Sequence, residues 1–317
     1  MPSSLAAVTP ALSLSLRTFS SDDPGSWEPL LERARIADAA GIDRLVVPDH
    51  VVFGEDLEAY GKPQLGGSVG GKQPTGPDGH WLEPLTLLSV VAGMTSHARL
   101  ATGILIAALR RPVTLAKSLA TLDVLSGGRV DLGVGVGWQR EEYEAAGLSF
   151  EGRGRLLDHT LEVCQTIWRD VDATYDSPEL HFEHIHSMPK PVQPGGVPIW
   201  VSGRMNRRVV ERVVRFGSGW IPWGDDANDP APGIARLHDA LAEAGRGDVR
   251  LQVTGSLPVV KDSDGALDVA RTMDGVPAIV AAGITDVRAN VAVPSEPNAG
   301  ADLLGELVSA FRAAVGR

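Results

Sequence analysis

Short strand-like runs alternate with longer helical stretches along the whole chain, and this alternation limits the possible folds more than any other property. Eight runs combine apolar residues, alternating or continuous, with β-branched ones, which is typical of strands. They cover residues 12–19, 44–50, 99–108, 129–137, 198–203, 219–224, 250–259 and 284–293. Eight strand-then-helix units in 317 residues favour a (β/α)8 barrel, the TIM-barrel form of the α/β class, over two Rossmann-like halves. We expect a single domain over residues 1–317.

Several helix boundaries are marked in the sequence. Ser26 is of a type that caps helix N-termini, and a first helix should run from it to Gly41. Pro112 suits the first turn of another helix, which should end at Gly127. A later helix should begin near Asn206. These boundaries define the helical half of the repeating unit.

Two connections are longer than a barrel requires. Residues 61–80, after the second strand, contain seven glycines and three prolines, which predicts a mobile loop. We interpret it as a lid, because loops that follow barrel strands lie at the catalytic end. Residues 171–197, after the fourth helix, are rich in proline and histidine. Since His181, His184 and His186 lack a familiar zinc spacing, we predict a surface hairpin there and no metal site.

The charge balance and the cysteine content exclude several classes of protein. Lys and Arg number 29 against 40 Asp and Glu, which gives a net charge of -11 at pH 7. This charge repels nucleic acids and anionic membranes, and no apolar run approaches the roughly 20 residues of a membrane helix. The only cysteine, Cys164, rules out an internal disulfide and suits a reducing compartment. We expect a cytoplasmic protein that acts on a small-molecule substrate.

In a (β/α)8 barrel the chemistry takes place where the strands end and the following loops begin. The second strand ends in Asp49 and His50. His50 is the candidate general acid/base, because imidazole exchanges a proton near neutral pH. Asp49 would orient this imidazole or contact a cofactor, and a purely structural role for the pair is the alternative. No strand ends in a lysine, which argues against a Schiff-base enzyme.

Three glycines, Gly133, Gly135 and Gly137, alternate along the fourth strand and point to one face. A dinucleotide-binding fingerprint needs a further glycine where this chain has Trp138 or Arg140, so the motif is of another kind. Glycine inside a strand marks the close approach of another backbone or of a flat ligand. Packing alone explains Gly133, whereas Gly137 lies at the catalytic end and makes room for a ligand.

Five segments resemble, in the same order, those of the luciferase-like flavin and deazaflavin oxidoreductases. They are IADAAGIDRLVVPDH, RLATGILIAALRRPVTLAKSLATLDVLSGGR, GRVDLGVGVGWQREEYEAAG, PKPVQPGGVPIWVSG and GSGWIPWG. The likeness covers most of the chain, from residue 12 to residue 315. It implies a (β/α)8 barrel, usually a homodimer, that binds FMN or coenzyme F420.

The resemblance also implies roles for particular residues. Asp49 and His50 would lie at the cofactor. Thr102, Gly103 and Ile104 would contact its ring, the last two joined by a non-proline cis peptide bond. The residues that would flank the ring and hold the phosphate are Val136, Gly137, Trp138, Ser202, Gly203 and Arg204. Free N–H groups at the start of the helix after Gly203 would complete the phosphate site, because helix N-termini bind anions.

Two further observations bear on the substrate and the cofactor. Trp138 stands where the deazaflavin-dependent sugar-phosphate dehydrogenases carry a glutamate, which favours a more apolar substrate. Arginines gather near the predicted catalytic end: Arg110, Arg111, Arg140, Arg204, Arg207 and Arg208. The polyanionic tail of F420 would use these charges better than the single phosphate of FMN.

We therefore expect an F420-dependent oxidoreductase that transfers a hydride between the deazaflavin and a small, fairly apolar substrate. An FMN-dependent luciferase-like monooxygenase is the first alternative, and a non-catalytic flavin-binding barrel is the second.

Overall fold

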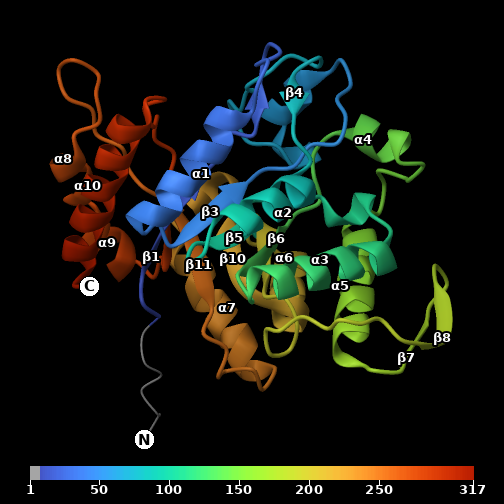
Figure 1. Cartoon of the computed structure of the whole chain (residues 1–317). Helices are drawn as coiled ribbons and strands as arrows, with labels where there is room; N and C mark the ends of the chain where they lie inside the picture. Colours follow the sequence, from blue (N-terminus) through green and yellow to red (C-terminus); the bar gives the residue numbers. More distant parts are fainter. Residues whose placement is uncertain (1–7) are drawn as a thin grey trace, which may run out of the picture.

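Eight parallel strands close into a barrel at the centre of the computed structural model, which describes residues 8–317. Around the barrel the strands follow the order β1, β12, β11, β10, β9, β6, β5 and β3, so that the last strand pairs with the first. Their bounds are β1 (Ala11–Ser15), β3 (Arg44–Val47), β5 (Arg99–Thr102), β6 (Val130–Val134), β9 (Ile199–Gly203), β10 (Gly217–Pro222), β11 (Gln252–Ser256) and β12 (Asp286–Ala289). The predicted barrel is confirmed (Figure 1).

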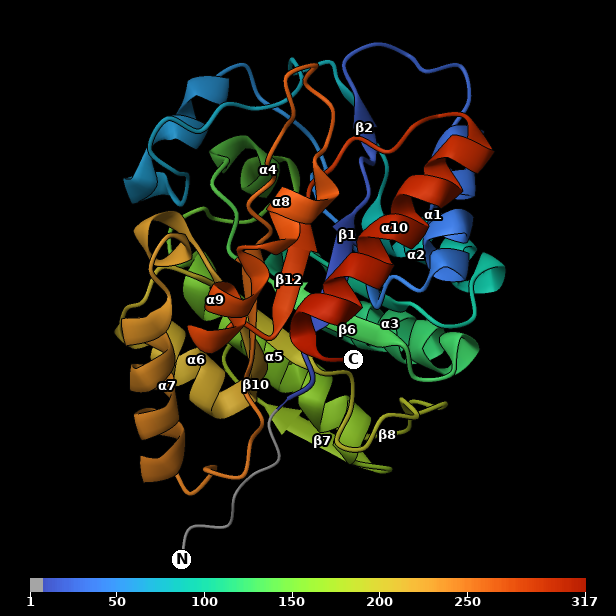
Figure 2. The same ribbon diagram turned by 90° about the vertical axis from the view of Figure 1, so that its left-hand side faces the viewer.

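Helices cover the outside of this barrel. Their bounds are α1 (Glu28–Ala40), α2 (Pro84–Met94), α3 (Pro112–Ser126), α4 (Arg140–Ala145), α5 (Arg153–Arg169), α6 (Arg207–Phe216), α7 (Ala231–Glu243), α8 (Val269–Met273), α9 (Val276–Ala281) and α10 (Pro297–Val315). The last helix packs beside the first, as Figure 2 shows, and so completes the outer layer. Within the described part of the chain, no helix combines the length and the apolar character needed to cross a bilayer.

The marked helix ends agree with the structure, with one shift. α3 begins at Pro112, and Gly127, with φ of 69°, caps its end as predicted. α1 ends before Gly41, whose φ is 91°. Its start lies two residues after Ser26, because Trp27 occupies the N-cap position. The Ser26 hydroxyl oxygen still accepts the N–H of Glu28, at 3.1 Å.

The hydrophobic core lies between the barrel and the helices. Successive residues of a strand point to opposite sides. Leu45, Leu100 and Leu132 point outward and are fully buried. Burial of one such side chain stabilises a fold by about 1.5–3 kcal/mol.

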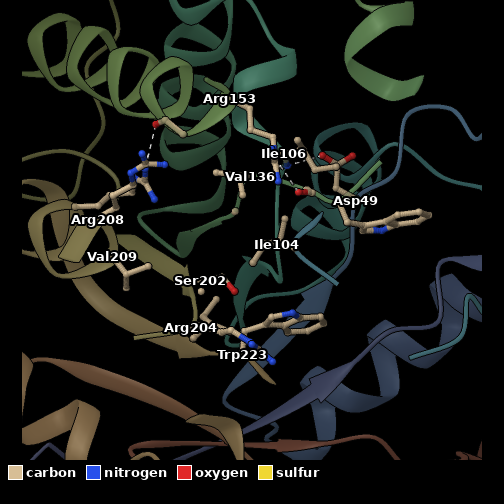
Figure 3. A pocket seen from close by; sticks show the side chains of 18 of the residues that line it. Asp49, Ile104, Ile106, Val136, Arg153, Ser202, Arg204, Arg208, Val209 and Trp223 are labelled. Atoms are coloured by element: carbon tan, nitrogen blue, oxygen red, sulfur yellow. Dashed lines mark hydrogen bonds between the residues drawn. The ribbon is translucent and has the colours of Figure 1, made fainter. Parts of the chain in front are cut away.

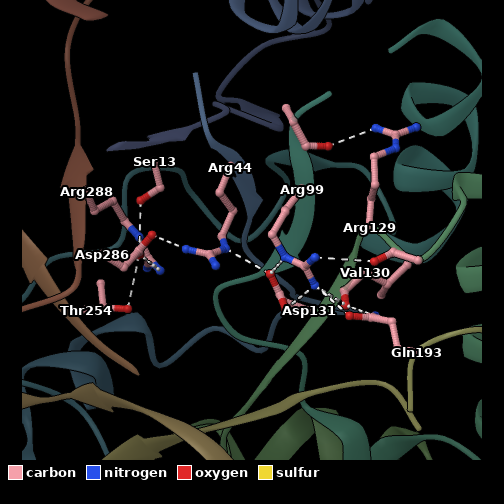
Figure 4. Close-up of polar contacts among 12 residues, drawn as sticks. Ser13, Arg44, Arg99, Arg129, Val130, Asp131, Gln193, Thr254, Asp286 and Arg288 are labelled. Carbon is pink, nitrogen blue, oxygen red and sulfur yellow. Dashed lines mark hydrogen bonds and ion pairs between the residues drawn. The ribbon is translucent and has the colours of Figure 1, made fainter. Parts of the chain in front are cut away.

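The amino ends of the strands enclose a layer of ion pairs inside the barrel (Figure 4). Arg44 donates to Asp131 at 2.9 Å and also pairs with Asp286. Arg99 donates to both oxygens of Asp131, at 2.6 and 2.7 Å. Burial alone would raise the pKa of Asp131, but Arg44 and Arg99 outweigh burial and hold the pKa below its ordinary value. We call these four residues the ion-pair layer.

The two long connections contain short elements of their own. The first, between β3 and α2, includes η1 (Leu57–Gly61), η2 (Pro63–Leu65) and β4 (His80–Trp81), and β4 pairs with β2 (Phe19–Ser20). The second includes β7 (Ala173–Asp176) and β8 (His181–Ile185), which form the predicted hairpin. Among residues 8–317, no group of His, Cys, Asp and Glu side chains is arranged to hold a metal ion.

Candidate functional site

A cavity of about 1410 Å³ opens at the carboxyl ends of the barrel strands. Its walls come from the ends of the strands, from the starts of α5 and α6, and from the 61–80 loop. In Figure 3, Ile104 and Val136 lie between Asp49 on one side and Ser202 and Arg208 on the other. Nearly all the predicted site residues line it: Asp49, His50, Gly103, Ile104, Val136, Gly137, Trp138, Ser202, Gly203 and Arg204.

Thr102 is the exception among the predicted site residues. Its side chain is buried outside the cavity lining, and its hydroxyl donates to the carbonyl oxygen of Gly133 at 2.7 Å. It therefore fastens β5 to β6. The alternation of side chains along β5 explains the difference, since Thr102 points to the opposite side from Gly103.

His50 lies between two polar side chains in the cavity wall. Its Nδ1 is 3.3 Å from Oε1 of Glu142, and its Nε2 is 3.4 Å from the amide nitrogen of Gln73. The side chain of Glu142 is fully buried, and Oε1 also accepts the N–H of Val51 at 2.8 Å. When a proton resides on Nδ1, Glu142 accepts its hydrogen bond, and Nε2 can then accept a proton from a bound molecule.

Asp49 does not orient His50, contrary to one of the roles expected for it. Its oxygens accept the N–H of Ile106 at 2.8 Å and a guanidinium N–H of Arg110 at 2.9 Å. The carboxylate beside the imidazole belongs to Glu142, on α4. Sequence reasoning missed Glu142 because only the folded chain brings α4 to the end of β3. Asp49 instead fixes the connection after β5, which forms part of the cavity floor.

Aromatic rings surround the imidazole. The ring centroids of Phe53, Trp81 and Trp138 lie 4.5, 4.9 and 5.9 Å from that of His50. Tyr60 continues this wall, with its ring centroid 5.4 Å from Trp138. The indole N–H of Trp138 is buried without a partner among the described residues. Such a wall suits a flat, largely apolar molecule with an acceptor for that N–H.

Glycine backbone and isoleucine side chains form much of the cavity floor. The Gly103–Ile104 peptide bond is cis, as the resemblance implied. A Cβ at Gly135 would lie 2.9 Å from Ile104, and Gly137 has φ of +65°. The packing explanation for Gly133 is confirmed, because a Cβ there would lie 2.0 Å from a backbone oxygen. Gly135 and Gly137 therefore make room for the side chains of Ile104 and Ile106, and these four residues together form an apolar floor that suits a planar ring.

The start of α6 is not the free helix N-terminus that we expected. The Asn206 side chain caps it by accepting the N–H groups of Arg208 and Val209, at 2.9 and 3.2 Å. The N–H of Met205 donates to Asp226 at 2.6 Å. Since asparagine directly before a helix is a preferred N-cap, this feature could have been predicted.

The start of α5 is more open to an anion. Its N-cap residue, Gly152, has no side chain, and its carbonyl oxygen accepts the N–H of Arg155 at 2.8 Å, which leaves the N–H of Gly154, in the cavity lining, without an acceptor among the described residues. Arg155 and Arg208 also line it, and neither pairs with a carboxylate of the described chain. The neighbouring arginines on α6 do: Arg207, Arg212 and Arg215 pair with Glu211, Asp158 and Glu162.

Only two of the six arginines that we predicted at the catalytic end, Arg204 and Arg208, line the cavity. Arg110 is held by Asp49 and also by Glu83, at 3.1 Å. Arg140 pairs with Glu151 at 2.9 Å. Carboxylates from distant segments neutralise these charges, which sequence spacing does not reveal. Sequence reasoning missed the five other arginines that line the cavity: Arg153, Arg155, Arg212, Arg215 and Arg288.

The 61–80 loop crosses this end of the barrel, and besides the contact of Gln73 with His50, two of its backbone carbonyl groups accept hydrogen bonds from the barrel side. The carbonyl oxygen of Leu65 accepts a guanidinium N–H of Arg153 at 2.8 Å. That of Gly67 accepts the indole N–H of Trp223 at 3.1 Å. The loop therefore forms part of the cavity wall, and these hydrogen bonds help to hold it there.

The residues present fit a flavin-type cofactor. The backbone floor accepts a flat ring, and Arg155 and Arg208 supply unpaired cations for a phosphate. Arg204 adds a buried Nε without a partner among residues 8–317. The buried Nε of Arg204 and the buried indole N–H of Trp138 would be costly to leave unsatisfied, whereas Arg155 and Arg208 are exposed and free to meet an anion.

Known proteins agree with this assignment. The luciferase-like monooxygenase family matches residues 11–302. An uncharacterized protein of Mycobacterium tuberculosis is 33% identical over 216 residues, which cover 67% of this chain and 73% of that protein.

Two solved structures share the fold. The coenzyme F420-dependent tetrahydromethanopterin reductase of Methanopyrus kandleri superposes with a TM-score of 0.67 at 16% identity, over 96% of this chain and 100% of the other. The oxygenating constituent of 3,6-diketocamphane monooxygenase of Pseudomonas putida, in complex with FMN, superposes with a TM-score of 0.70 at 13% identity, over 94% and 96%. The chain therefore belongs to the luciferase-like monooxygenase family.

Proposed function

We propose that this protein is an F420-dependent oxidoreductase acting on a small, flat and largely apolar substrate. The observation that supports F420 is the pair of unpaired arginines, Arg155 and Arg208, in the cavity wall. A single phosphate would occupy one such cluster, whereas the longer anionic tail of F420 can use both this cluster and the surrounding surface.

The cavity suggests how the cofactor would be held. The ring would lie on the floor between Gly103 and Gly137. The phosphate would lie between Ser202 and the start of α5, within reach of Arg155 and Arg208. The N–H of Gly154 at the start of α5 would add to this site, since a helix start favours negative charge.

The protein itself would position the substrate against the cofactor and exchange a proton with it. The cofactor, when bound, accepts or donates the hydride, that is, two electrons and one proton. The Nε2 atom of His50 would take the remaining proton from the substrate during oxidation, or return it during reduction. Glu142 would hold the proton on Nδ1, and the aromatic wall around His50 would exclude water from this exchange.

FMN-dependent oxygenation is the second candidate. The Pseudomonas putida enzyme holds FMN in the same fold, and the backbone floor accepts either ring. The two candidates differ in what lies beyond the phosphate: FMN ends there, and F420 continues into carboxylates. Affinity for the two cofactors therefore separates them.

The test is a titration of the purified protein with F420, with FMN and with the deazaflavin riboside that lacks the phosphate tail, followed by fluorescence. We expect F420 to bind at least about tenfold more tightly than either of the others, because charge-assisted contacts contribute about 1.5–3 kcal/mol each. Tighter binding of FMN would favour oxygenation instead. Binding of neither cofactor would refute the proposal, and binding without turnover of any substrate would indicate the non-catalytic barrel.

A further inference from the structure

Arg288 places a guanidinium group on the floor of the cavity. It belongs to β12, two residues after Asp286, so both side chains point into the barrel (Figure 4). Arg288 lines the cavity, and its side chain is only 15% exposed. It therefore lies where the barrel interior meets the site.

Arg288 makes no side-chain hydrogen bond to any residue that the structure describes, and its Nε is buried without a partner. The nearest carboxylate is Asp286, at 3.9 Å. Asp286 is already engaged by Arg44 and accepts hydrogen bonds from Ser13 at 3.1 Å and Thr254 at 3.3 Å. The hydrogen-bonding capacity of this permanently charged group is thus unused by the described chain, and its exposed part faces the cavity.

The charges inside the barrel do not balance. Arg44, Arg99 and Arg288 face Asp131 and Asp286, which leaves one positive charge in excess. Burial of an uncompensated charge is costly, and a guanidinium cannot relieve that cost by losing its proton. Arg99 meets solvent, with 33% of its side chain exposed, so the more deeply buried Arg288 is the charge that a bound anion would compensate.

The residue opposite Arg288 makes room for its guanidinium. A Cβ at Gly103 would lie 2.9 Å from the Nη1 atom of Arg288. The guanidinium therefore reaches across the barrel from β12 to β5, beneath the position that a flat ring would take. Arg288 lies apart from Arg155 and Arg208, which line the far wall on α5 and α6.

We propose that Arg288 is an anion subsite that binds a negatively charged planar oxygen group of a molecule in the cavity. This inference rests on the proposed function and refines its substrate class to a flat, apolar body with one anionic end. Two sources share the required chemistry: a carboxylate of the substrate, and the pyrimidine oxygens of the reduced cofactor, on which negative charge accumulates. A guanidinium can bind either group through two parallel N–H donors.

The test uses Arg288→Met, which removes the charge and nearly preserves the length. Benzoate and its neutral isostere benzamide are titrated by calorimetry into the wild type and the variant, with and without F420. Oxidised and reduced F420 are titrated separately. Arg207→Met is the matched control, because Arg207 is an exposed arginine outside the cavity.

We expect the wild type and the control to bind benzoate about tenfold or more tightly than benzamide, and Arg288→Met to lose this preference. Unchanged affinity for F420 would then identify the substrate carboxylate as the source. A loss of affinity for reduced F420 alone would identify the cofactor.

The variant should melt at the same temperature as the wild type or higher, because Asp286, the carboxylate nearest to Arg288, keeps its contacts with Arg44, Ser13 and Thr254. If Arg288→Met binds benzoate, benzamide, oxidised F420 and reduced F420 with the affinities of the wild type, the proposal is overturned. A marked fall in melting temperature would also overturn it, since Arg288 would then belong to the fold. If the protein binds neither F420 nor FMN, the proposed function fails, and benzoate binding to the cofactor-free protein still decides the role of Arg288.

Discussion

The two ends of the barrel use arginine in opposite ways. At the amino end, Arg44 and Arg99 are the first residues of their strands, and both are paired with Asp131 in the ion-pair layer. At the carboxyl end, Arg208 and Arg288 line the cavity without hydrogen-bonding to a described carboxylate. A paired buried charge serves the fold, and breaking the pair destabilises it. An unpaired charge beside a cavity offers the protein no such benefit, and we infer that it serves a ligand.

The largest expected effect is a loss of activity at the carboxyl end of the barrel. His50→Asn should lower turnover by roughly 10²–10⁴-fold, the usual contribution of a general acid/base, because the variant lacks a group that can exchange a proton. Its melting temperature and its affinity for F420 should stay near those of the wild type. Steady-state kinetics, thermal unfolding and F420 titration check these three expectations.

A variant that melts early would show that His50 belongs to the fold instead. Glu142→Gln serves as the companion variant, since its side chain keeps the shape but loses the negative charge beside Nδ1. It should lower kcat and leave KM nearly unchanged, and it should alter the pH dependence of kcat. An unchanged pH profile would remove Glu142 from the proton transfer.

Substitutions at the amino end of the barrel should lower stability and leave cofactor binding nearly unchanged. Arg44→Met leaves Asp131 and Asp286 without their shared cation, which should cost about 3–5 kcal/mol of unfolding free energy. Affinity for the cofactor should change little in the fraction that remains folded. Denaturant unfolding of the variant, beside that of Arg288→Met, measures the contrast. Equal unfolding free energies for Arg44→Met and Arg288→Met would contradict the difference that we infer between the two ends of the barrel.

Acid should lower the stability of the ion-pair layer at the amino end by a smaller amount. The folded state lowers the pKa of Asp131, so its contribution to stability is present above the ordinary carboxyl value and is lost as the pH falls below it. We expect the unfolding free energy of the wild type to decrease below about pH 4, and that of Arg44→Met to decrease less in the same range. Urea unfolding at several pH values tests this, and parallel curves would contradict it.

The smallest effect separates two adjacent arginines of α6. Arg208→Ala should weaken F420 binding by about tenfold, because it removes one charge-assisted contact. Arg207→Ala should leave it unchanged, since Arg207 pairs with Glu211 and does not line the cavity. Fluorescence titration of both variants decides, and equal losses would indicate a general effect of charge.

Sequence reasoning succeeded where a feature depends on local pattern. The alternation of strands and helices predicted the barrel, and the family motif predicted the cis peptide bond at Gly103. It failed where a side chain finds its partner across the fold. Spacing could not reveal that Glu142 reaches His50 or that Asp49 binds Arg110. Arg288 could have been noticed, because it alternates with Asp286 on one face of a strand.

The salt dependence of F420 binding tests the central claim most directly. The dissociation constant would be measured at rising ionic strength for the wild type and for the double variant Arg155→Ala/Arg208→Ala. If Arg155 and Arg208 at the carboxyl end bind the anionic tail, the affinity of the wild type for F420 should fall steeply with salt. Salt screens the attraction between exposed charges. The double variant should bind more weakly at low salt and respond much less to its increase. Parallel salt curves for the two proteins would contradict the claim, since these arginines would then contribute nothing specific to the bound anion.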